Sequence, residues 1–177
     1  MLPAGPRISA VARPGVGGRG PPPGDRNRFS TFFVLANTNR APPSDAVANA
    51  WGDDLQDAFA RSFRQNWRDV IRYNTPGGAP EHGKIDDIKI NSAVEIGPRF
   101  GRLHMHAIVR IQHRVQAGGI HLNVQRLRDA IRQHGSTQAV RNLPVVWVKA
   151  FTGEAALDDY ILKGASTPLN VRAILSD

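Results

Sequence analysis

Apolar and polar residues alternate along two neighbouring stretches of the chain, residues 87–97 and 103–112. In the first stretch the even positions are apolar, apart from Ser92, and in the second every odd position is apolar. A period of two residues predicts a β-strand with one buried face. The tight turn at residues 98–101 lies between the two stretches, so we expect them to pair as an antiparallel hairpin.

Other segments have the patterns of strands and amphipathic helices. Residues 28–36 are almost continuously apolar, as in a strand covered on both faces, and residues 143–151 predict another strand. Apolar side chains recur every three or four positions in residues 45–72, and two more helices are predicted at residues 123–134 and 153–164. The order β-α-β-β-α-β-α predicts an α+β fold: a central antiparallel sheet, ferredoxin-like or RRM-like, with its helices packed on one face.

The beginning of the chain differs in composition from the rest. Six prolines and six glycines occur among the first 24 residues, so we expect residues 1–27 to be a disordered tail rich in Pro, Gly and Arg. The same residues exclude the amphipathic helix of a transit peptide, and no segment predicts a membrane span. We therefore expect one folded domain, at residues 28–177, and no membrane partner.

The overall charge and the absence of cysteine narrow the classes of function. The formal net charge is +8, which favours a polyanionic partner, nucleic acid first. The chain has no cysteine, which excludes disulfides, thiolate zinc sites and a cysteine nucleophile. An intracellular location is the natural expectation for such a chain.

Glu95, His104 and His106 lie on the polar face of the predicted hairpin. Alternate residues of a strand point to the same face, and two pairing registers bring the three side chains together, with Glu95 opposite either His104 or His106. Imidazole and carboxylate ligands suit Mn²⁺, hydrated Mg²⁺ or Zn²⁺, with positions left open for a substrate oxygen. The alternative is a pair of solvent-facing histidines on a half-exposed sheet.

Tyr160 and Lys163 lie three residues apart, and hence on one face of the predicted helix 153–164. A tyrosine near a metal can act as a nucleophile, because the metal polarises a phosphoryl group and a nearby cation favours deprotonation of the phenol. The alternative is that the Tyr160 ring packs in the core while Lys163 pairs with Asp159.

Together these segments resemble the HUH endonucleases, in particular the replication initiator (Rep) proteins of circular single-stranded DNA viruses and rolling-circle plasmids. The resemblance covers residues 28–165. In chain order, FFVLANTN is similar to the family's first motif, LHMHAIV to its histidine-hydrophobic-histidine motif, and YILK to its tyrosine-x-x-lysine motif. Glu95 matches the carboxylate that the family carries on the strand before the histidines.

The resemblance implies an enzyme that nicks and rejoins DNA to start rolling-circle replication. Glu95, His104 and His106 would hold Mn²⁺ or Mg²⁺, and Tyr160 would attack the scissile phosphate, leaving a 3′-hydroxyl and a 5′-phosphotyrosine. Lys163 would orient the phosphate or offset its charge. The implied partner is single-stranded DNA of a replication origin, carried on a hairpin.

Further expectations concern the compartment in which the protein acts, a helicase domain and oligomerisation. The host nucleus is expected for a protein of a eukaryotic virus, and the cytoplasm for one of a bacterial element. The chain leaves no room for a helicase domain after Lys163, so we expect an excised or a stand-alone nuclease domain. Oligomerisation would use regions absent from this chain.

Candidate DNA contacts come from the first motif and from the hairpin. Asn37 and Asn39 follow the first strand, while Lys89, Asn91 and Arg110 flank the histidines on the polar face. Lys89, Asn91 and Arg110 can also be ordinary polar residues of a wet sheet face. The long helix adds a row of arginines at helical spacing, but acidic residues early and basic residues late are also what the helix dipole prefers; the row is Arg61, Arg64, Arg68 and Arg72.

Three other functions compete with this interpretation. An iron oxygenase with a two-histidine, one-carboxylate site would need an all-β barrel, which the helical patterns disfavour. A non-catalytic nucleic-acid-binding module would read bases with exposed aromatic residues, where this hairpin offers histidine and glutamate. A transposase or conjugative relaxase of the same superfamily fits the spacing of YILK less well than an initiator does.

Overall fold

The computed structural model describes residues 28–74, 85–115, 119–151 and 168–176. It contains strands and helices in the order β1 (Arg28–Asn37), α1 (Asp45–Val70), β2 (Ile71–Tyr73), β3 (Ile85–Ile96), β4 (Leu103–His113), β5 (Ile120–Leu122), α2 (Val124–His134), α3 (Gln138–Arg141), β6 (Val145–Phe151) and β7 (Pro168–Ser176). The predicted α+β class is confirmed.

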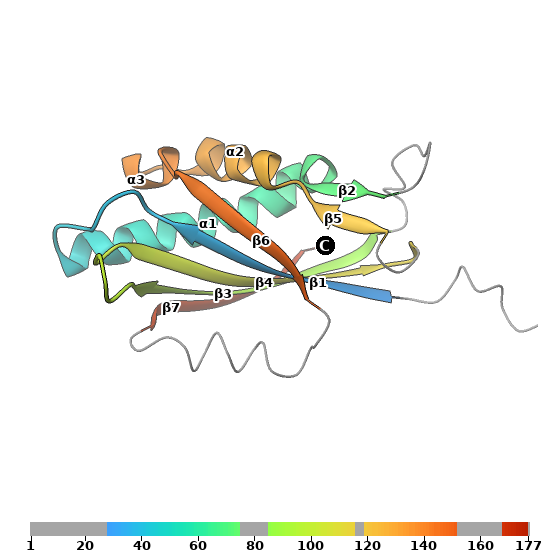
Figure 1. Ribbon diagram of the computed structural model, residues 1–177, viewed down its shortest axis with the longest axis horizontal. Helices are drawn as coiled ribbons and strands as arrows, with labels where there is room; N and C mark the ends of the chain where they lie inside the picture. Colours follow the sequence, from blue (N-terminus) through green and yellow to red (C-terminus); the bar gives the residue numbers. More distant parts are fainter. Residues whose placement is uncertain (1–27, 75–84, 116–118, 152–167, 177) are drawn as a thin grey trace, which may run out of the picture.

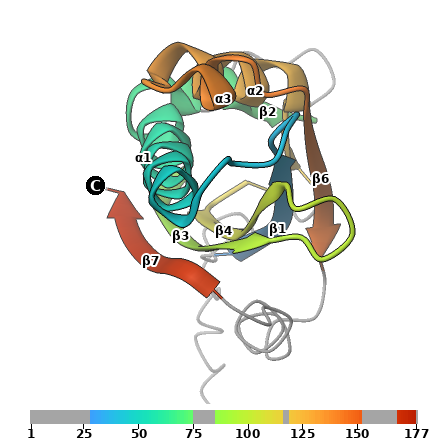
Figure 2. The ribbon, with the colours of Figure 1, turned by 90° about the vertical axis from the view of Figure 1, so that its left-hand side faces the viewer.

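The main sheet has five strands in the order β6-β1-β4-β3-β7, and all neighbouring strands are antiparallel. A separate two-stranded sheet pairs β2 with β5. The helices α1, α2 and α3 form a layer on one side of the main sheet (Figure 1), and an end-on view shows the sheet curving beneath them (Figure 2). The predicted packing of helices on one face holds for the three described helices.

The core lies between the helix layer and the sheet. It takes the even positions of β1, the odd positions of β4 and the buried stripe of α1; its largest buried members are Leu55, Phe59, Phe63, Ile71, Leu103, Met105, Ile111, Leu127, Ile131 and Leu143. The stripe predicted on the long helix is confirmed, because its apolar positions are buried or packed against this core. Ser44 begins α1, since its side chain accepts a hydrogen bond from the Val47 amide.

Ser92 interrupts the apolar face of β3, yet it is buried and faces the helix layer. The Gln56 side-chain amide donates to the Ser92 hydroxyl at 2.9 Å and to its carbonyl at 3.0 Å. A buried hydroxyl without such a partner would be costly. The polar exception in the strand pattern is therefore matched by a polar residue of α1.

Asp54 ties α1 to the segment before α3. Its carboxylate accepts four hydrogen bonds, from the amides and hydroxyls of Ser136 and Thr137, at 2.6–2.9 Å. Burial raises the pKa of Asp54, but these hydrogen bonds lower it by more, so the net shift is below the ordinary value. The acid is thus stabilised in its charged form between two helices.

Several boundaries differ from the sequence predictions. The long helix ends at Val70 rather than at Arg72, because Ile71–Tyr73 turn into an extended strand that pairs with β5. Arg72 therefore does not continue the predicted helical row of arginines. Neither α3 nor the edge strand β7 was predicted, and the predicted helix 153–164 lies outside the described residues.

The prediction that β1 is covered on both faces holds only in part. Phe32, Val34 and Ala36 are buried under the helices, whereas the odd positions face the other side of the sheet, where Thr31 is buried and Phe29 is 55% exposed. No described helix covers that side (Figure 1). We call this surface the open face of the sheet. In the part of the chain that the structure describes, no helix is long and apolar enough to cross a membrane.

Candidate metal centre

The hairpin of β3 and β4 has one of the two predicted registers. Glu95 is paired with His104, and Ala93 with His106, so Glu95 lies diagonally across from His106. The turn determines this register: the Gly97 amide donates to the Arg102 carbonyl at 2.8 Å, and the Gly101 amide to the Gly97 carbonyl at 3.0 Å. Gly101 has φ of +60°, a conformation that favours glycine. Both histidines and Glu95 consequently belong to the open face.

Thr38 connects the end of β1 to the beginning of β4, next to His104. Its amide donates to the Leu103 carbonyl at 3.0 Å, and its hydroxyl accepts from the Leu103 amide at 3.1 Å and donates to the Arg40 carbonyl at 2.9 Å. The residue is fully buried. The sequence did not predict this role of Thr38. The only indication was a small hydroxyl-bearing residue between Asn37 and Asn39.

Glu95 and His106 are in direct contact. Glu95 Oε1 lies 3.0 Å from His106 Nε2, and both side chains are mostly shielded from solvent. His106 Nε2 has no hydrogen-bond partner among the described groups. The Phe33 ring packs beside the imidazole, with 5.8 Å between the ring centroids. A buried imidazole nitrogen thus lies directly beside a carboxylate oxygen.

His104 is held against the turn rather than against Glu95. A Cβ added to Gly97 would overlap the His104 imidazole, so the glycine provides the space that the ring occupies. Burial lowers the pKa of His104, and His106 and Arg102 lower it further, while Glu95 raises it. The net shift is downward, which favours the neutral imidazole that can donate a lone pair to a metal.

The carboxylate of Glu95 and the imidazoles of His104 and His106 are suitable ligands for a divalent ion, but the three side chains do not converge on one point. Among the described residues, no group of three or more His, Cys, Asp or Glu side chains is arranged to hold an ion. Glu95 and His106 are already together, and His104 shares their face and lies opposite Glu95. The contact of His106 with Glu95 and the position of His104 on the same face bring the three candidate ligands near one another, and this residue set suits a divalent ion.

The predicted DNA-contact residues divide into two groups around this centre. Asn37 ends β1 opposite His104, and Asn39 is exposed in the loop that follows. Lys89 and Arg110 are paired across β3 and β4, with Asn91 one step along the same face. The Oδ1 atoms of Asn37 and Asn91 are buried without a hydrogen-bond partner among the described residues. Tyr160 and Lys163 lie outside the described residues.

The other histidines that the structure describes have positions away from the centre. His113 is buried, and its Nε2 lies 2.8 Å from the Ser30 hydroxyl. His134 Nε2 lies 2.7 Å from the Asn66 side-chain oxygen. His121 is exposed on β5. None of them contributes to the candidate centre.

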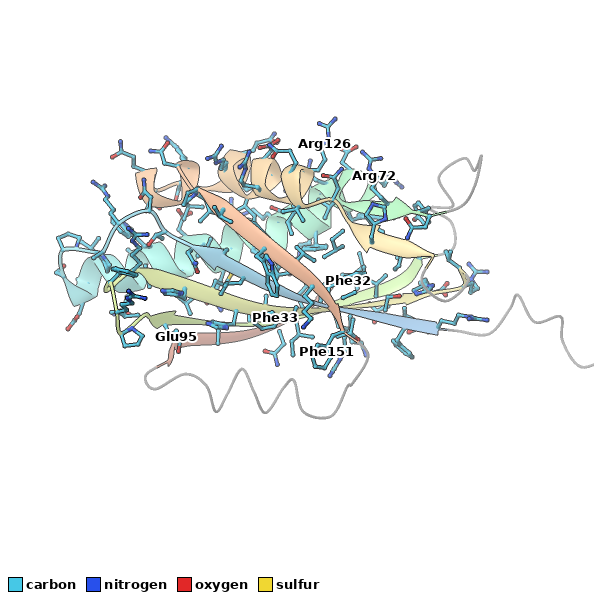
Figure 3. The ribbon with its side chains drawn as sticks, viewed as in Figure 1. Phe32, Phe33, Arg72, Glu95, Arg126 and Phe151 are labelled. Atoms are coloured by element: carbon cyan, nitrogen blue, oxygen red, sulfur yellow. The ribbon has the colours of Figure 1, made fainter. Side chains whose placement is uncertain are left out.

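Sequence reasoning missed the aromatic side chains of the open face. Phe33 of β1 and Trp147 of β6 are in edge-to-face contact, with centroids 6.3 Å apart. Phe33 and Phe151 also pack on Ala93 and Ile108 in a small second apolar cluster. Figure 3 shows Phe33, Phe151 and Glu95 on the side of the sheet away from the helices, whereas Phe32 points toward them. The available indication in the sequence was the aromatic residues at odd positions of residues 28–36, such as Phe33.

No protein-family model, no curated protein and no solved structure matches this chain. The candidate site consists of Glu95, His104 and His106, on one face of one hairpin.

Proposed function

We propose that this protein is a metal-dependent endonuclease of the HUH type that nicks and rejoins single-stranded DNA, as Rep proteins do at replication origins. The observation that carries the proposal is the contact between Glu95 and His106, with His104 on the same face of the hairpin. A carboxylate and two imidazoles are a suitable ligand set for Mn²⁺ or Mg²⁺. The proposal includes an intracellular location.

The strand order supports the finer part of the fold assignment. The strands β6, β1, β4 and β3 lie side by side in that order, each antiparallel to its neighbours. In a ferredoxin-like β-α-β-β-α-β chain, the fourth, first, third and second strands lie side by side in that order. Here β6, β1, β4 and β3 are the fourth, first, third and second of these four strands along the chain. We include this topology in the proposal, with β7 as an added edge strand.

In the proposed reaction, the Tyr160 phenolate oxygen attacks phosphorus and displaces the 3′-oxygen of the preceding nucleotide. The departing 3′-oxygen takes up a proton and becomes a 3′-hydroxyl, and the phosphate remains on the tyrosine as a 5′-phosphotyrosine. A bound Mn²⁺ or Mg²⁺ would supply Lewis-acid polarisation of the phosphate. Lys163 offsets negative charge on the phosphate. A 3′-hydroxyl can later lose its proton and attack the phosphotyrosine, which breaks the bond from phosphorus to the Tyr160 oxygen, releases the tyrosine and rejoins the strand.

A covalent adduct tests this proposal. The protein is incubated with Mn²⁺ and a pool of single-stranded oligonucleotides that includes stem-loop sequences and carries a fluorophore at the 3′ end. Because Tyr160 would retain the 3′ fragment, a denaturing protein gel should show a labelled protein band. The band should be absent with EDTA, with Tyr160→Phe, and with the same pool labelled at the 5′ end.

The chain offers a matched control, because Tyr73 is its second tyrosine and lies on β2. Tyr73→Phe should leave the adduct intact. A labelled band that persists in Tyr160→Phe would remove Tyr160 as the nucleophile. Tight DNA binding with no adduct from any oligonucleotide would favour a non-catalytic nucleic-acid-binding module instead. An adduct formed only with transfer-origin or transposon-end sequences would favour a relaxase or transposase.

A further inference from the structure

The aromatic residues of the open face form a continuous row that ends at the candidate metal centre. Trp147 of β6 contacts Phe33 of β1, and Phe33 contacts His106 of β4. Trp147 is 48% exposed although it lies on a sheet face, where a large aromatic ring is normally covered. The row therefore leads from the edge strand, where a ring surface meets solvent, to Glu95 and His106.

The row is supported from within the sheet. Phe33 packs on the buried side chains of Ile108 and Ala93, and Phe151 joins the same cluster. Such packing restricts the rotamers of Phe33, so that it in turn restricts Trp147 through their edge-to-face contact. Rigid aromatic rings lose little conformational entropy when they bind a ligand. The open face thus presents a preformed stacking surface.

Basic side chains lie beside the row and indicate the charge of its ligand. Lys149 is exposed on β6 and is paired with Phe33 across the β1–β6 ladder. Lys89 and Arg110 are cross-strand partners on the same face, and Asp87 lies 3.9 Å from Lys89. The basic residues of this face attract a polyanion.

We propose that Trp147 and Phe33, with Lys149, bind unpaired DNA bases on the open face, and that the bound strand leads toward Glu95 and His106. Exposed rings beside cations are the chemistry that recognises single-stranded nucleic acid, because each base has a stackable face and each linkage a charge. Duplex DNA is excluded, since its base faces are hidden in the helical stack. The direction toward the metal centre rests on the proposed nuclease function, whereas stacking on Trp147 does not.

The test is binding of a fluorescein-labelled oligothymidylate of 16 nucleotides, measured by anisotropy in EDTA so that no nicking occurs. Trp147→Ala should weaken binding by about tenfold, the size of effect found when a base-stacking aromatic is removed. Trp147→Phe should retain most of the affinity, because it keeps a ring. Lys149→Ala should reduce the salt slope of log K by about 0.7, the value for one phosphate contact in a single strand.

Two positions in the helix layer provide matched controls. Val124 is an exposed apolar residue of α2, and Arg126 is an exposed cation of the same helix, far from the open face in Figure 3. Val124→Ala and Arg126→Ala should leave affinity and salt slope unchanged. In addition, bound oligothymidylate should quench the tryptophan fluorescence of the unmodified protein, and this quenching should be lost in Trp147→Phe.

Unchanged affinity in Trp147→Ala, or equal binding of duplex and single strand, would overturn the inference even if adducts form. Conversely, loss of binding in Trp147→Ala without any adduct in the unmodified protein would support the stacking surface and reject the nuclease. Sedimentation at several protein concentrations tests whether a second copy of the chain, rather than DNA, covers the open face. Dimerisation that Trp147→Ala abolishes would assign the rings to a second copy of the chain and overturn the inference.

Discussion

Glu95 Oε1 lies 3.0 Å from His106 Nε2, diagonally across the β3–β4 hairpin, although Glu95 is paired in register with His104. Adjacent strands lie about 5 Å apart, and the right-handed twist of a sheet brings one diagonal pair closer than the other. The two histidines therefore differ in their surroundings: one contacts the carboxylate and the other packs against the turn. This difference leads to separate predictions for the two.

Glu95→Gln should weaken Mn²⁺ binding at least about tenfold, because a neutral amide oxygen is a poorer ligand than a carboxylate. The measurement is electron paramagnetic resonance of unbound Mn²⁺ during titration. Asp86→Asn is the matched control, since Asp86 is an exposed carboxylate of the same strand that pairs with Arg114 at 3.2 Å. Equal Mn²⁺ affinity in the two variants would contradict Glu95 as a ligand.

Gly97→Ala should disturb the centre without unfolding the protein. The new methyl group would overlap the His104 imidazole, so the ring must leave its position against the turn. We expect weaker Mn²⁺ binding and a lower adduct yield, with an unchanged far-ultraviolet circular dichroism spectrum. Gly52→Ala in α1 is the control, because its Cβ would only touch Val94 of β3, at 3.4 Å. If both variants bind Mn²⁺ like the unmodified protein, His104 has no role as a ligand.

Asp54→Asn should destabilise the fold by about 3 kcal/mol, since the amide group cannot accept the hydrogen bonds of one carboxylate oxygen, and bonds to a charged acceptor are strong. Urea denaturation followed by circular dichroism measures this loss. Because the folded pKa lies below the ordinary 3.8, the contribution of Asp54 is present above pH 3.8 and disappears as pH falls through the folded value. Asp53→Asn, at the exposed neighbour, should change stability little.

The stability of the protein should fall as pH decreases below about 6.5. Burial, with a smaller effect of Arg28, lowers the pKa of His113 by more than the Val115 backbone and Asp86 raise it. The unfolded chain therefore binds a proton more readily than the folded one between the folded pKa and 6.5, and unfolding is favoured there. His104 and His134 act in the same direction, again mainly through burial.

Urea midpoints at pH 7.5, 6.5 and 5.5 measure this dependence. A single histidine can contribute at most about 1.4 kcal/mol per pH unit. His113→Gln should flatten the profile whatever its effect at pH 7.5, whereas His121→Gln, at an exposed position of β5, should preserve its slope. A profile that His113→Gln leaves as steep as before would contradict a buried neutral His113.

The local patterns predicted the main elements well, but not those whose formation depends on a distant partner. The long apolar stripe of α1 and the alternation of β3 and β4 are repeated over many residues, and both predictions are confirmed. Three-residue β2 is too short to carry a period, and it forms because β5 supplies its hydrogen bonds. The edge strand β7 is likewise defined by its pairing with β3.

The sequence by itself determined which side chains share a face. In a strand the direction of each side chain follows from the local backbone, so Glu95, His104 and His106 could be assigned to one face without a structure. The turn at Gly97 and Gly101 then selected one of the two registers, and side-chain packing selected His106 as the contact of Glu95. Only the tertiary structure decided that β6 lies beside β1 and brings Trp147 to Phe33, because no local rule chooses between distant strands of similar pattern.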